Sequence, residues 1–80
     1  MTKRHIVEKL TPMVREAFGN AELVVDPMMS AETVDGWTSL AFMRLLSQVE
    51  QGFGVKFKIM ELVTIRTLGD LVDAIERIAN

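Results

Sequence analysis

The 80-residue sequence contains no cysteine and no tyrosine, and its only aromatic residues are four Phe and one Trp. Without cysteine the chain has no disulfide and no thiolate of its own. No apolar run approaches the ~20 residues of a membrane span, and no apolar signal-peptide segment follows the basic start. A basic excess is also missing, because the net charge is −2, which argues against a nucleic-acid binder. These absences favour a soluble cytoplasmic protein.

What is present is enough apolar material to fold. Hydrophobic residues make up 49% of the chain and charged residues 25%, which excludes a disordered tail. A chain of this length buries only about 60–65% of its unfolded surface, so we expect one small domain, residues 1–80, with a thin core. Six methionines and few aromatic residues predict that this core is aliphatic and adaptable.

Apolar residues at three- and four-residue steps predict four helical segments. The first segment ends at Gly19-Asn20, the second runs from about Ser39 to Gly52, and a short third covers 59–63. The last follows Thr67-Leu-Gly-Asp70, which resembles a capping box with Asp in place of Glu. The pattern therefore predicts an all-α four-helix bundle, with three longer helices, one short third helix and a long loop between helices 1 and 2.

Two segments leave choices open. Pro12 lies inside the first apolar stripe, so that helix is either kinked there or shortened to begin at Pro12 after a Thr11 cap; we favour the kink. Residues 20–37 form the long loop, in which 23–25 are read as loop residues pinned onto the core, since no second strand exists to pair with them.

The second helix has a predicted apolar row and a predicted outer face. The row is expected to contain Leu40, Met43, Leu46 or Ser47, and Phe53, widened by Leu45 and Val49. The outward positions are expected to be Ala41, Arg44, Gln48 and Gln51.

Independent catalysis is not expected. The only histidine is His5, no metal-ligand spacing is present, and Ser39 has no base placed beside it by the sequence. Ser39 is either part of a helix start capped by Thr38 or an accessible attachment point. A phosphate on Ser39 would lie by the free N–H groups and positive end of the second helix.

At these residues the sequence resembles the acyl and peptidyl carrier proteins, a phosphopantetheine-binding family. Gly36-Trp37-Thr38-Ser39-Leu40 aligns without a gap with the family's Asp-Ser-Leu signature, and the stretches 53–57 and 67–72 resemble the end of its second helix and the start of its last. The resemblance covers about residues 2–78. It implies that 4'-phosphopantetheine is attached covalently to Ser39, so that the reactive sulfur belongs to the cofactor.

The resemblance also implies the partners, and two departures bear on them. Thr38 replaces the family's Asp, whose charge Asp35 would partly supply, and the second helix lacks the acidic residues of fatty-acid carriers. We expect a stand-alone, monomeric carrier for a specialised pathway. Its partners would be a phosphopantetheinyl transferase and a loading ligase, ketosynthase or acyltransferase.

A partner face or acyl-chain groove is expected near the arm. Its candidate residues are Trp37, Phe42, Met43, Ile59, Leu62 and Val63, for each of which plain packing is the alternative, together with Arg44. The main rival function is an interaction module of the same fold that is never modified.

Overall fold

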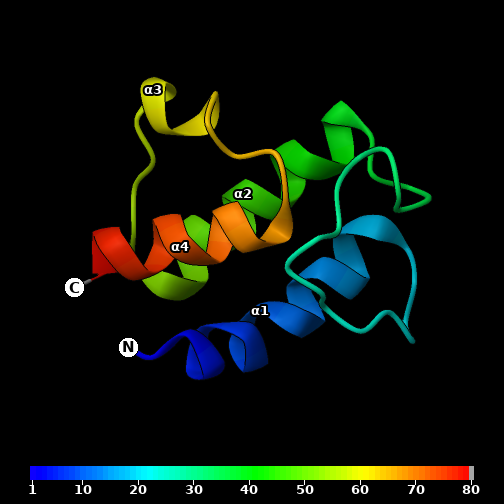
Figure 1. Cartoon of the computed structure of the whole chain (residues 1–80), viewed down its shortest axis with the longest axis horizontal. Helices are drawn as coiled ribbons and strands as arrows, with labels where there is room; N and C mark the ends of the chain where they lie inside the picture. The colour runs from blue at the N-terminus through cyan, green and yellow to red at the C-terminus, as the bar shows by residue number, and fades with distance from the viewer. Residues whose placement is uncertain (80) are drawn as a thin grey trace.

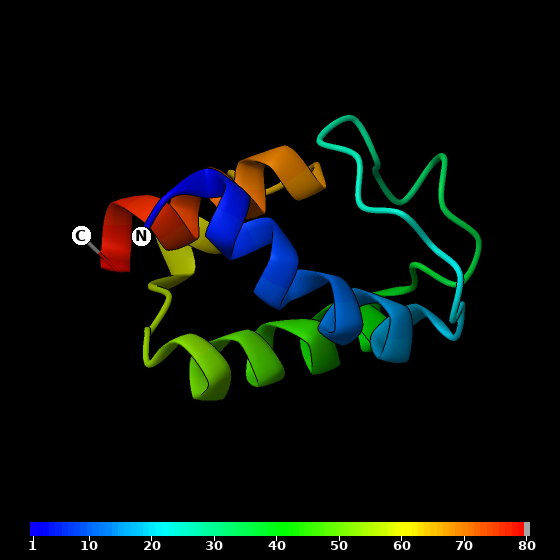
Figure 2. The same ribbon diagram turned by 90° about the horizontal axis from the view of Figure 1, so that it is seen from below.

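The computed structural model describes residues 1–79, which form four helices and no strand (Figure 1). The helices are α1 (Lys3–Phe18), α2 (Ser39–Phe53), α3 (Ile59–Leu62) and α4 (Leu68–Ala79). α1 contacts both α2 and α4. The start of α1 and the last turn of α4 lie at one end of the bundle, and the long loop between α1 and α2 lies at the other (Figures 1 and 2). The predicted all-α architecture is confirmed.

α1 runs through Pro12 without a break. Thr2 caps its start by accepting the His5 N–H, and Pro12 lies inside the helix. The Thr11 hydroxyl donates to the Val7 carbonyl at 2.7 Å, one turn back, so Thr11 is an interior residue and not a cap. The alternative of a shorter helix beginning at Pro12 is therefore wrong. Gly19 ends the helix where the sequence predicted.

The core is aliphatic, with Phe18 its only buried aromatic side chain among residues 1–79. α1, α2 and α4 supply most of it, and single residues of the connecting segments complete it. The buried residues are Ile6, Leu10, Val14, Phe18, Leu23, Val34, Ala41, Leu45, Leu46, Val49, Val55, Ile65, Leu68, Leu71, Val72, Ala74 and Ile75.

The apolar row predicted for α2 is partly wrong. Leu45, Leu46 and Val49 of that row are buried, as predicted, but Leu40 and Met43 are 63% and 62% exposed, and Ala41, which was expected to face outward, is buried. The buried face of α2, which packs against α1, is thus rotated away from Leu40 and Met43 and towards Ala41. Gln48, also expected to face outward, is half-buried, and Arg44 and Gln51 are exposed as predicted.

The long loop is tied to the start of α4. Met29 and Pro27 carbonyls accept the N–H groups of Leu68 and Gly69 at 2.9 and 3.0 Å, so the loop backbone satisfies two donors that a helix start leaves free. Of the apolar loop residues, Leu23 is buried and Val25 half-buried, as predicted. The remaining one of the three, Val24, is 72% exposed.

The predicted capping box at α4 is confirmed. Thr67 Oγ1 accepts the Asp70 N–H at 3.1 Å, and Asp70 Oδ2 accepts the Thr67 N–H at 3.1 Å and the Arg66 N–H at 3.0 Å. The Arg66 N–H, followed by the Thr67 groups, holds the pKa of the Asp70 carboxyl below its usual value. The two side chains thus fix the angle at which the chain enters α4.

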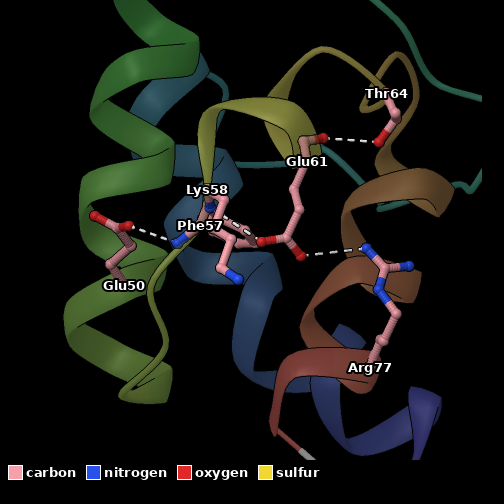
Figure 3. Close-up of polar contacts among 6 residues, drawn as sticks. All are labelled: Glu50, Phe57, Lys58, Glu61, Thr64 and Arg77. Atoms are coloured by element: carbon pink, nitrogen blue, oxygen red, sulfur yellow. Dashed lines mark hydrogen bonds and ion pairs between the residues drawn. The ribbon is translucent and has the colours of Figure 1, made fainter.

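None of the residues of α3 is fully buried, although Leu62 is half-buried against the core, and carboxylates hold the helix in place. Glu50 of α2 accepts the Phe57 N–H at 3.0 Å, and Glu61 accepts the Lys58 N–H at 3.0 Å (Figure 3). The other oxygen of Glu61 faces Arg77 of α4 at 3.4 Å. The Lys58 N–H and the Arg77 guanidinium together hold the pKa of the Glu61 carboxyl below its usual value.

Candidate functional site

The start of α2 combines an exposed hydroxyl with free backbone donors. Thr38 is the N-cap, with its Oγ1 accepting the Ala41 N–H at 3.1 Å, as predicted. Ser39 is the first helical residue, is exposed, and its hydroxyl has no hydrogen-bond partner within residues 1–79. Within the same residues, the N–H groups of Ser39 and Leu40 are also unpaired. In contrast to the closed start of α4, this helix end is open to an anion.

Gly36 fixes where the helix start lies. Its φ is +87°, and a Cβ at this position would be 2.5 Å from the carbonyl oxygen of Phe18. The turn that precedes Ser39 therefore lies directly against the last residue of α1, at a distance that only glycine permits. The Trp37 N–H bonds back to the Val34 carbonyl at 3.3 Å, and Val34 is itself buried in the core.

Trp37 anchors the site by stacking between two phenylalanines. Its ring centroid lies 5.0 Å from that of Phe18 and 5.5 Å from that of Phe42, with interplanar angles of 21° and 19°. Such offset stacks add about 0.5–1.5 kcal/mol each beyond the burial of area. Trp37 thus packs against the end of α1 and the first turns of α2, which is the packing alternative raised by the sequence.

A hollow lies beside these rings. Its volume is about 370 Å³, and Trp37 and Phe42 form part of its wall together with Ile65, Arg66 and residues 30–32 of the loop. The hollow brings the connection between α3 and α4 next to the start of α2, although the two segments are far apart in the sequence. Its wall has both apolar side chains and the charged side chains of Glu32 and Arg66.

The other predicted partner residues differ in exposure. Ile59 is 79% exposed, and Met43 and Arg44 are exposed on α2, so packing is not their role. Leu62, by contrast, is half-buried against the core. Asp35 is exposed in the turn before the site.

Exposed apolar residues that the sequence analysis did not assign to a partner face are Leu40 and Met60, whereas Val63, which it did assign, is 63% exposed. For Met60 the available signal is the shortness of α3, because a helix of four residues cannot bury both of its sides.

Residues 1–79 contain no group of three or more His, Cys, Asp or Glu residues placed to hold a metal ion. None of the helices in this part of the chain has the length and the apolar run needed to span a bilayer.

Comparison with known proteins identifies the family of this chain. The family model for the phosphopantetheine attachment site matches residues 9–75, which is most of the chain and includes Ser39. The chain belongs to this phosphopantetheine-binding family. A comparison with curated protein sequences gave no match.

Among solved structures, this phosphopantetheine-binding protein is similar to a holo acyl carrier protein from Geobacter metallireducens, whose structure was determined in solution by NMR. The two are 32% identical, with a TM-score of 0.82 over 89% of this chain and 82% of the other. The fold and the family together make the protein a carrier that bears 4'-phosphopantetheine, and members of this family are carriers rather than enzymes.

The start of α2 fits that cofactor. A phosphodiester needs an accessible hydroxyl to join it and hydrogen-bond donors for its charge, and the exposed Ser39 hydroxyl and the free N–H groups of Ser39 and Leu40 meet both needs. The first turn of α2 contains no acidic residue that would repel the phosphate. When bound, the cofactor supplies a thiol that holds an acyl group as a thioester.

Proposed function

We propose that Ser39 is the attachment point of the phosphopantetheine arm. The observation that supports this proposal is the coincidence of an exposed, unbonded hydroxyl with two free helix N–H groups inside the family's attachment region. In the attachment step Ser39 Oγ forms a bond to the phosphorus of coenzyme A next to pantetheine. The pyrophosphate bond breaks, adenosine bisphosphate leaves, and the hydroxyl proton passes to a base of the transferase.

The residues around Ser39 have separate roles in this proposal. Thr38 holds the helix start through its bond to the Ala41 N–H, so the geometry does not depend on the Asp that the family has at this position. The exposed Asp35, four residues before Ser39 in the chain, would partly supply the charge of that missing Asp for the metal-bound coenzyme A of the transferase. Trp37 and Gly36 keep the attachment point rigid against α1.

The protein would then carry acyl or aminoacyl groups for a specialised pathway. Its partners would be a phosphopantetheinyl transferase and an enzyme that loads or extends the cargo, such as a ligase, ketosynthase or acyltransferase. The absence of an acidic stripe on the exposed face of α2, where Arg44 is the only charged residue, supports a role other than that of a general fatty-acid carrier. The monomeric state and the cytoplasmic location remain predictions from the sequence.

Mass spectrometry tests the proposal. The protein is incubated with coenzyme A and a broad-specificity phosphopantetheinyl transferase, and the expected result is a mass gain equal to one phosphopantetheinyl group, located on the peptide containing Ser39. Ser39→Ala should abolish the gain, whereas Ser47→Ala, which removes an exposed hydroxyl two turns further along α2, should leave it unchanged. No gain with any transferase would favour the rival, an unmodified interaction module.

A further inference from the structure

Residues 39–66, which contain α2, α3 and the segments on either side of α3, have a net charge opposite to that of the rest of the chain. Residues 39–66 contain four basic and two acidic residues, a net charge of +2. The remaining 52 residues contain five basic and nine acidic residues, a net charge of −4. The protein is therefore acidic overall but basic in the segment that contains α2 and α3, whereas the loop before Ser39 contributes the exposed carboxylates Glu32 and Asp35.

The two acidic side chains of this region already form hydrogen bonds or ion pairs within the protein. Glu50 is half-buried and bonded to the Phe57 N–H, and Glu61 is bonded to the Lys58 N–H and paired with Arg77 of α4 (Figure 3). Neither carboxylate is free to meet a basic group of a partner without breaking a bond that holds α3. The negative charge of the region is thus already used in positioning α3.

The four basic side chains of this region, by contrast, are not paired within the described part of the protein. Arg44, Lys56, Lys58 and Arg66 are all exposed, and none forms an ion pair with another side chain of residues 1–79. Lys58 and Arg66 lower the pKa of Glu61 and Asp70 through their charge, but only as secondary causes. Arg66 also lines the hollow beside Trp37, which places one of these charges close to the start of α2.

Exposed apolar side chains are concentrated in the same segment of the chain. Eight large hydrophobic residues of the described chain are strongly exposed, and five of them belong to α2, to α3 or to the residue that follows α3: Leu40, Met43, Ile59, Met60 and Val63. The Glu50 bond to the Phe57 N–H holds the segment before α3 against α2, so the two sets lie on neighbouring elements (Figure 3). Apolar side chains concentrated in this way mark an interaction surface and not random exposure.

We propose that this surface docks onto enzymes whose carrier-binding site is an apolar depression bordered by acidic side chains. The four exposed cations select an acidic border, because like charges placed opposite one another across an interface disfavour the wrong partner. The five apolar residues supply the desolvated centre of the contact. The proposal rests on the proposed function, since the partners are the enzymes that act on the arm at Ser39.

Two broad-specificity phosphopantetheinyl transferases serve as probes, one with acidic and one with basic side chains around its active site. The expected kcat/KM for arm attachment is about tenfold higher with the acidic enzyme at low salt, and the difference should shrink at high salt as screening removes it. Arg44→Glu and Lys56→Glu should each lower kcat/KM with the acidic enzyme by roughly three- to tenfold at low salt. Arg4→Glu makes the same change of charge on an exposed residue of α1 and should have little effect.

The outcomes separate the two proposals. Equal rates with both enzymes, a preference for the basic enzyme, or an equal loss in Arg4→Glu would overturn the docking inference while leaving attachment at Ser39 intact. If neither enzyme attaches an arm, the proposed function fails, and titration calorimetry of Ser39→Ala with the same two enzymes still measures docking by itself. Tighter binding to vesicles of phosphatidylglycerol than to the acidic enzyme, lost in Arg44→Glu, would assign the surface to an anionic membrane instead.

Discussion

Gly36→Ala tests whether the attachment site is held by a close approach of two backbones. The new side chain must adopt a φ near +87°, which costs an L-residue roughly 1–2 kcal/mol. Its Cβ would also lie 2.5 Å from the Phe18 carbonyl oxygen, a backbone atom that can move only if the end of α1 moves. The two effects together should lower the free energy of unfolding by about 3 kcal/mol, a large part of the stability of so small a domain.

Gly54→Ala is the matched control. Gly54 also has a positive φ, +67°, but no atom lies within 4 Å of the position of its Cβ. It should therefore show the backbone penalty alone, about 1 kcal/mol. Urea denaturation followed by circular dichroism measures both free energies. In thermal melts the expected fall in Tm is roughly 12–24 °C for Gly36→Ala against 4–8 °C for Gly54→Ala.

The fluorescence of Trp37 provides a second measurement at the site itself. Because Trp37 follows Gly36 and is the only tryptophan, its emission should change in folded Gly36→Ala and stay the same in Gly54→Ala. If Gly36→Ala is no more destabilising than Gly54→Ala, the close contact with Phe18 does not exist and the reasoning about the rigid attachment point is wrong.

Two further predictions concern the core and the capping box. Leu45→Ala should destabilise the protein by about 3 kcal/mol, since Leu45 is fully buried. Leu40→Ala, on the exposed side of α2, should change stability by less than about 0.5 kcal/mol. Similar losses for the two variants in urea denaturation would contradict the observed orientation of α2. Asp70→Ala should lower stability by about 1 kcal/mol at neutral pH through loss of the cap. Because the pKa of Asp70 is lower in the folded state, its contribution is present above the unfolded-state pKa and is lost as the pH falls through the folded value. The difference between Asp70→Ala and the parent should therefore shrink in acid, and a difference that is constant with pH would refute the role of its charge.

The sequence predicted the helices well because their ends have local chemical signals. Thr38, the Thr67 and Asp70 pair and Gly19 each act within a few residues, so their roles can be read without knowing the fold. The orientation of α2 could not be read in the same way. Leu40, Met43 and Leu45 are all apolar, and only the position of α1 decides which of them is covered.

The site was predicted in the same uneven manner. Ser39 and its cap follow from adjacent residues, but the stack of Phe18, Trp37 and Phe42 joins positions that are far apart in the sequence. The contact of Gly36 with the Phe18 carbonyl is equally hidden, because a glycine in a loop is ordinarily explained by a turn alone. The hydrogen bonds that Glu50 and Glu61 accept within the protein could also be found only in the structure, because a glutamate in such a segment is ordinarily expected to face solvent.

The aromatic stack and α3 are held by separate sets of interactions. Release of α3 would break the bonds of Glu50 and Glu61, neither of which involves Phe18, Trp37 or Phe42. Since α3 buries no residue, it belongs to the parts of a fold that open at low free energy. With the arm on Ser39 as proposed, its base would keep its position while the neighbouring surface rearranges, so that successive enzymes would meet a fixed attachment point beside an adjustable docking surface.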